Sequence, residues 1–119
     1  MSPSREDPRA DLVGVLHDLA REISTGGDTD VEVGTMFRSP GLRADGKIVA
    51  FLGFDGGLIV KLPHTRGRDL IANDAAAPVT MGTRTMKEWF ELPAAQSPPQ
   101  SYEAWLPLVR EALAFVRGS

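Results

Sequence analysis

Apolar side chains recur at three- and four-residue spacings near the start of the chain, at Leu12, Leu16, Leu19 and Ile23. This is the period of an amphipathic helix that buries one face. Asp7 followed by Pro8 suits the start of such a helix, and Gly26-Gly27 suits its end. The pattern predicts a helix over residues 8–24.

The next apolar positions alternate with polar ones, as in a half-buried strand. Val31–Met36 shows this alternation and runs into Phe37. Two further β-rich runs, Lys47–Phe54 and Leu58–Leu62, are separated by Asp55-Gly56-Gly57. Glycine there can take the positive φ angles that a tight hairpin turn requires. We expect one strand followed by a β-hairpin.

The second half of the chain predicts a helix, a loop, a strand and a last helix. His64–Asn73 can form a short helix with Leu70 and Ile71 inward, although Gly67 lowers its stability by up to about 1 kcal/mol. Residues 75–85 are rich in small residues, proline and glycine and predict a loop, and residues 86–92 predict a strand.

The last helix is expected to begin at a cap formed by Ser101 and to end at Gly118. Pro107 is compatible with this helix only in its first turns. One face of the helix would carry its large apolar residues, which are Trp105, Leu108, Val109, Ala112, Leu113 and Val116.

The order of these elements is α-β-β-β-α-β-α, which predicts an α+β fold. We expect a two-layer sandwich in which helices pack on one face of an antiparallel β-sheet of about four strands. The chain has 119 residues, 42% of them hydrophobic, so one domain over residues 1–119 with an ordered core at about 8–117 is expected.

Composition narrows the functional classes. Cysteine is absent, which rules out disulfides and thiolate ligands and suits a reducing compartment. The first residues lack the apolar stretch of a signal peptide, and no apolar run approaches the roughly 20 residues that span a bilayer. We expect a cytoplasmic protein without a membrane partner.

The net charge of −3 argues against indiscriminate binding to nucleic acid. Charge is unevenly spread, however, because residues 38–87 carry eight basic and four acidic side chains. Lys47 and Lys61 lie near the same end of the predicted hairpin, so a basic rim is one interpretation and ordinary solubilising charge is the other. The candidate contacts to an anion or nucleic acid are Arg38, Arg43, Lys47, Lys61, Arg84 and Lys87.

Catalytic and metal-binding motifs are not recognised in the sequence. His17 and His64 are the only histidines, and a metal site would need companions in a suitable geometry. Ser39 lies outside the Gly-x-Ser-x-Gly pattern, so a triad with His64 and Asp69 is rejected. We predict no catalytic residue, no metal site and no cofactor.

Several stretches together resemble the TfoX N-terminal domain family, which is also grouped with YjbR-like proteins. They are residues 35–50, 57–63 and 86–93 and the closing helix with Trp105 and Leu113, within residues 31–117. The resemblance implies a bacterial protein with a two-layer α/β fold, a regulatory role and DNA binding as a family-level suggestion. Arg38 stands where the family usually has glycine, and Gly67 interrupts the helix after the hairpin.

Three functional hypotheses follow. The first is a non-catalytic binding or regulatory module, acting in transcription through its exposed sheet face and surrounding loops. The second is a protein-interaction or homodimerisation domain that uses a hairpin edge or the Trp105 helix. The third is a small-ligand binder or unrecognised enzyme with a cleft near His64 and residues 81–86.

Overall fold

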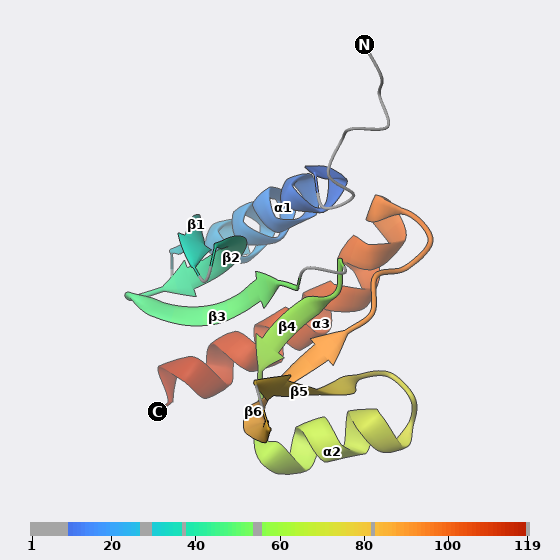
Figure 1. Cartoon of the computed structure of the whole chain (residues 1–119). Coiled ribbons are helices and arrows are strands. Elements are labelled where there is room, and N and C mark those ends of the chain that lie inside the picture. Colours follow the sequence, from blue (N-terminus) through green and yellow to red (C-terminus); the bar gives the residue numbers. More distant parts are fainter. Residues whose placement is uncertain (1–9, 27–29, 37, 54–55, 82, 119) are drawn as a thin grey trace.

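The computed structural model describes residues 10–26, 30–36, 38–53, 56–81 and 83–118, and Figure 1 shows the chain. The described residues form three helices and six strands. In chain order these are α1 (Ala10–Gly26), β1 (Val31–Met36), β2 (Ser39–Ala44), β3 (Lys47–Leu52), β4 (Leu58–Lys61), α2 (His64–Ala72), β5 (Ala77–Met81), β6 (Arg84–Leu92) and α3 (Pro98–Arg117).

The six strands form one antiparallel sheet in the order β1-β2-β3-β4-β6-β5. The first four strands pair in chain order. After α2 the chain returns to the sheet so that β6 pairs with β4, with Leu58 opposite Leu92, and β5 becomes the far edge. The predicted α+β class with an antiparallel sheet is confirmed, but six strands replace the expected four.

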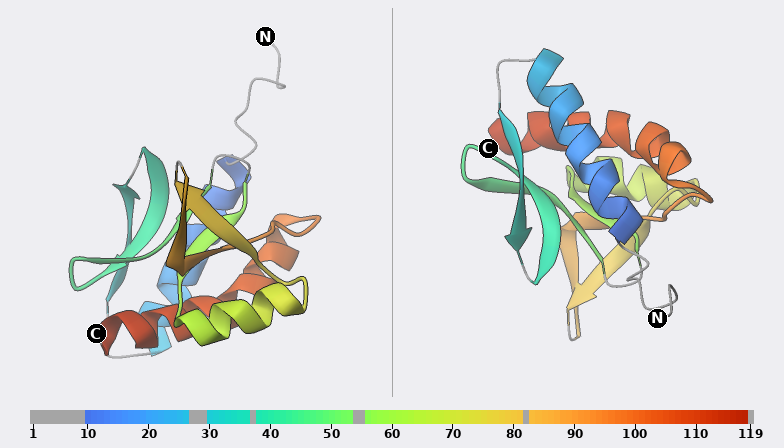
Figure 2. Two further views of the ribbon diagram at one scale, coloured as in Figure 1. Left: turned by 60° about the horizontal axis from the view of Figure 1, so that its bottom comes forward. Right: turned by 90° about the horizontal axis from the view of Figure 1, so that it is seen from above.

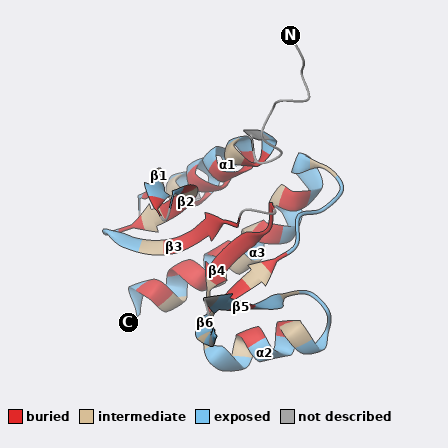
Figure 3. Ribbon diagram, viewed as in Figure 1, coloured by how far each residue is buried: buried red, intermediate tan, exposed pale blue. Residues whose placement is uncertain are grey.

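All three helices pack on one face of the sheet (Figure 2). Leu16 and Leu19 of α1, Trp105 of α3 and Leu70 of α2 share one core cluster with alternate residues of the strands. The buried face of α1 matches the predicted helix stripe, and Figure 3 shows that most of β3 and β4 is buried. This layering leaves the opposite face of the sheet without any of the described helices, and we call it the helix-free face.

Two strands were absent from the prediction, and proline and glycine explain why. Ser39-Pro40-Gly41 opens β2, yet these residue types disfavour strands. Gly41 is required because the position of a Cβ there is occupied by Met36 Sδ and, at 2.6 Å, by the carbonyl oxygen of Ala50. Pro78 is tolerated in β5 because this strand lies at the sheet edge. The predicted loop over residues 75–85 is therefore wrong.

The last helix begins earlier than predicted. Ser97, not Ser101, is the N-cap of α3, and its side chain accepts a hydrogen bond from the backbone N–H of Gln100 at 3.3 Å. Pro107 therefore lies well inside the helix rather than in its first turns. The helix continues past it because the face carrying Trp105 and Val109 is fully buried.

The remaining boundaries agree within a few residues. The strand over Val31–Met36 lies where the alternation placed it, and the hairpin strands β3 and β4 lie within the two predicted β-rich runs. α2 starts at His64 as predicted. Gly118 is the C-cap of α3. The predicted Asp7-Pro8 helix start and the Phe54-Asp55 part of the hairpin lie outside the described residues.

Candidate binding surfaces

A second apolar cluster lies on the face of the sheet that has no helix. Its buried members are less than 10% exposed and come from four strands: Met36, Phe51, Ile59 and Val79. Successive side chains of a strand point to opposite faces, so Ile59 faces away from Leu58 and Val60, which belong to the helix-side core. The cluster therefore extends across the sheet from β1 to β5, which are its two edge strands. Figure 2 shows that the sheet is curved.

Trp89 is the half-buried aromatic residue beside this cluster. Its ring meets Phe51 edge to face, with ring centroids 5.5 Å apart and an interplanar angle of 63°. The ammonium of Lys61 lies over the Trp89 ring, 5.8 Å from the centroid. Cation–π contacts of this kind stabilise by about 0.5–1 kcal/mol at exposed sites. We call the residues Met36, Phe51, Ile59, Lys61, Val79 and Trp89 the open-face cluster.

The structure separates Lys47 from Lys61. The two lysines lie toward the same end of the β3–β4 pair, as predicted. Lys47, however, donates a hydrogen bond from Nζ to the carbonyl oxygen of Val116 in α3 at 3.5 Å, on the helix side of the sheet. Lys61 lies over Trp89 on the other face. These two cations do not form one rim.

Arg43 lies on the same face as Lys61, nearer the β1 edge. Its guanidinium pairs with Glu32 at 3.2 Å and covers Gly34, where an added Cβ would lie 3.0 Å from Nη2 of Arg43. The Nε of Arg43 is shielded from solvent and makes no hydrogen bond with the residues that the structure describes. Its charge is thus already partly compensated by Glu32.

The other basic candidates are spread over the molecule. Arg38 is exposed in the β1–β2 turn, and Arg84 begins β6 directly after the β5–β6 turn, opposite Met81. Lys87 is exposed in β6, and its carbonyl oxygen accepts a hydrogen bond from Nδ1 of His64 at 3.1 Å. Of the six candidate contacts, the structure brings Arg43 and Lys61 to the helix-free face and directs Lys47 to the other face.

Comparisons with models of known families, with curated proteins and with solved structures found no match.

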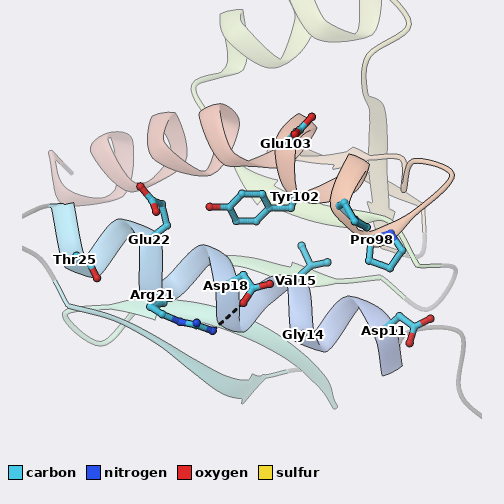
Figure 4. Close-up of a pocket in the computed structure, with 11 residues that line it drawn as sticks. Asp11, Gly14, Val15, Asp18, Arg21, Glu22, Thr25, Pro98, Tyr102 and Glu103 are labelled. Carbon is cyan, nitrogen blue, oxygen red and sulfur yellow. Dashed lines mark hydrogen bonds and ion pairs between the residues drawn. The ribbon is translucent and has the colours of Figure 1, made fainter.

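A groove between α1 and the first turns of α3 is the second candidate surface (Figure 4). It encloses about 570 Å³, within the usual range for ligand-binding clefts. Tyr102 of α3 extends over α1 and Val15 lies below it. The lining residues are Asp11, Gly14, Val15, Asp18, Arg21, Glu22, Thr25, Pro98, Pro99, Tyr102 and Glu103.

The histidines and the rejected triad are well separated. Ser39 is buried in β2, whereas His64 and Asp69 lie in α2, which packs on β5 and β6 beyond two intervening strands. His17 is exposed on α1. Among the described residues, no three histidine, cysteine or acidic side chains are grouped so that they could hold a metal ion.

The structure corrects two further predictions, the Trp105 interaction surface and the loop at residues 81–86. Trp105 is 1% exposed, and its Nε1 donates to the carbonyl oxygen of Pro93 at 3.2 Å, so its indole cannot meet a partner. Residues 81 and 84–86 belong to the β5 and β6 strands rather than to a loop beside His64. None of the described helices has the length and apolar character needed to cross a membrane.

Sequence reasoning missed both the open-face cluster and the groove. The signal for the first was available, because Ile48–Leu52 and Leu58–Val60 are continuously apolar instead of alternating. Such runs indicate a strand whose two faces are both covered by apolar contacts. No comparable signal marks the groove, because it depends on how α1 and α3 are placed.

Proposed function

We propose that this chain is a non-catalytic binding module of the TfoX N-terminal type that acts in the bacterial cytoplasm. Its partner is another protein, which docks beside the buried part of the open-face cluster, where Ile48, Lys61, Met86 and Trp89 remain partly exposed. A regulatory role, including one in transcription, is then exerted through that protein. The resemblance of residues 31–117 to this family supports the class of module.

The apolar character of the helix-free face supports this proposal most directly. A sheet face turned to water is normally polar, because only one face of such a sheet packs on the core. Here residues from β1, β3, β4 and β5 form a buried cluster on that face, and Ile48, Met86 and Trp89 remain partly exposed around it. Aromatic residues and methionine are enriched at the centre of protein interfaces.

The charge beside Trp89 indicates the chemistry of the partner. Covering Trp89 would also remove water from the Lys61 ammonium, and a desolvated cation requires an acidic partner. The occupant that fits is a protein segment with an apolar or aromatic anchor followed by aspartate or glutamate.

A display library of random peptides, selected on the immobilised protein, tests the proposal. Selected peptides should carry an apolar anchor with acidic residues. Their affinity should fall about tenfold, or about 1.4 kcal/mol, in Trp89→Ala and also in Lys61→Glu, which removes the cation without opening the apolar cluster. His17→Ala, on the exposed side of α1, is the matched control. Peptides that bind all four proteins equally would contradict the proposal.

Nucleic acid is the second candidate partner, because a cation beside a partly exposed aromatic ring also holds a stacked base. Labelled single-stranded and duplex DNA, followed by fluorescence anisotropy at low and physiological salt, separates the two. Binding that falls steeply with salt and disappears in a Lys61/Arg84/Lys87 charge-reversed variant would favour DNA. We expect no such binding, because Arg43 is paired with Glu32 and Lys47 lies on the other face.

A further inference from the structure

We infer that the groove between α1 and α3 is a second binding site, which takes a short peptide segment bearing lysine or arginine next to an apolar side chain. This site lies in the helical layer, so it is separate from the open-face cluster on the other side of the sheet. The inference does not depend on the proposed function and can fail or succeed alone.

The dimensions of the groove suit an extended peptide. Along α1 it is lined from Asp11 to Thr25, which at 1.5 Å per residue corresponds to about 21 Å. An extended chain of about six residues has this length. Val15 and Tyr102 supply apolar surface, and Pro98 extends it at one end (Figure 4). Pro99 also lines the groove. The floor therefore fits an apolar side chain.

The rim of the groove determines the sign of the charge on the peptide. Among the described lining residues, the carboxylates are Asp11, Asp18, Glu22 and Glu103, and the one cation is Arg21. Arg21 pairs with Asp18 at 2.8 Å, and Glu22 lies 3.5 Å from Arg110. Asp11 and Glu103 form no ion pair or hydrogen bond with other described residues. The uncompensated negative charge is complementary to lysine or arginine.

The groove gives a reason for glycine at position 14, whereas the packing of the chain gives none. It lies inside α1, where glycine is less favourable than alanine. An added Cβ at Gly14 would meet no atom within 4 Å, so packing within the chain does not require glycine here. Glycine at this position instead leaves the α1 backbone open to the groove, where an extended peptide can approach it closely.

Fluorescence anisotropy with a short labelled peptide of repeated Ala-Leu-Lys units tests the inference, with a matched Ala-Leu-Glu peptide as control. We expect the lysine peptide to bind and the glutamate peptide not to bind. Gly14→Ala should weaken binding about tenfold while raising the melting temperature by about 2–6 °C, so that the loss cannot arise from unfolding. Glu103→Gln should weaken binding about threefold.

Two controls make the result specific to the groove. Glu88→Gln removes an exposed carboxylate of β6, and Trp89→Ala alters the open-face cluster; neither should change the affinity for the lysine peptide. The inference is overturned if Gly14→Ala binds as tightly as the wild type. It is equally overturned if Glu88→Gln weakens binding as much as Glu103→Gln, because that outcome indicates attraction to net charge alone.

Discussion

Gly67 and Gly14 both lie inside helices, but their surroundings differ. The side of α2 that carries Gly67 is pressed against the Phe90 ring, whose atoms occupy the position of a Cβ. Gly67 is therefore buried by close packing between α2 and β6, whereas Gly14 faces the open groove. From the sequence alone, glycine in a helix is a cost; the structure shows that Gly67 is also a packing requirement.

Substitution of Gly67 by alanine should destabilise the protein in spite of the better helix propensity of alanine. The added methyl group would overlap Phe90, a core residue that is 3% exposed, and overpacking of a core costs about 1–3 kcal/mol. Urea unfolding followed by circular dichroism measures this free energy. A variant as stable as the wild type would show that α2 does not pack on Phe90 in this way.

Replacement of Arg38 by glycine should increase the free energy of unfolding. Its φ is +62°, a left-handed conformation that costs a non-glycine residue roughly 1–2 kcal/mol. Glycine removes this strain but loses more chain entropy on folding, so Arg38→Gly should stabilise by about 0.5–1 kcal/mol.

Asp45 provides the matched control for this substitution. It also has a positive φ, +53°, but aspartate tolerates this conformation better than arginine does. Asp45→Gly should therefore change the unfolding free energy less than Arg38→Gly, as measured by the same urea titration. A larger gain at Asp45 than at Arg38 would refute the explanation by backbone strain.

At the scale of elements, α2 is joined to α3 by a bidentate ion pair. Arg66 donates from Nε and Nη2 to the two carboxylate oxygens of Glu111 at 2.8 and 3.1 Å. The hydrogen bond and the charge of Glu111 raise the pKa of Arg66 above its usual value. The stability that this shift contributes is present at any pH below the ordinary arginine range and is lost only above it.

A double-mutant cycle with Arg66→Met and Glu111→Gln should give a coupling of at most about 1 kcal/mol, because both side chains are 40% exposed. The coupling should decrease as salt is added. Because Arg66 stays charged between neutral and moderately alkaline pH, the coupling energy should not change over this interval. A coupling that vanishes in this pH interval would contradict the assignment.

The elements predicted from sequence are those that their own residues mark clearly. α1 carries a clear apolar period, β3 and β4 are β-rich apolar runs on either side of a glycine turn, and the sequence located all three. β2 and β5 were missed because Gly41 and Pro78 are suited to their places only by neighbouring strands. One local signal was available, since Asp45-Gly46, with two positive φ angles, is the turn between β2 and β3.

At the scale of the whole molecule, the candidate surfaces depend on register and curvature. The sequence identifies Trp89 and Lys61 as residues of interest but cannot place one above the other. It also cannot show that Lys47 and Lys61 lie on opposite faces, because that depends on the pairing of β3 with β4 and on the position of α3. Docking on the helix-free face is thus a hypothesis that needs a direct test in solution.

The two tryptophans provide that test. A ¹⁵N-labelled sample, titrated with a peptide from the display selection, gives one indole N–H signal for each of them. We expect the Trp89 signal to shift, together with backbone signals of β3, β4 and β6. The Trp105 signal should stay in place, because that indole is buried and its N–H donates a hydrogen bond to the carbonyl oxygen of Pro93. Shifts confined to α1 and α3, with the Trp89 signal unmoved, would contradict the proposed use of the helix-free face.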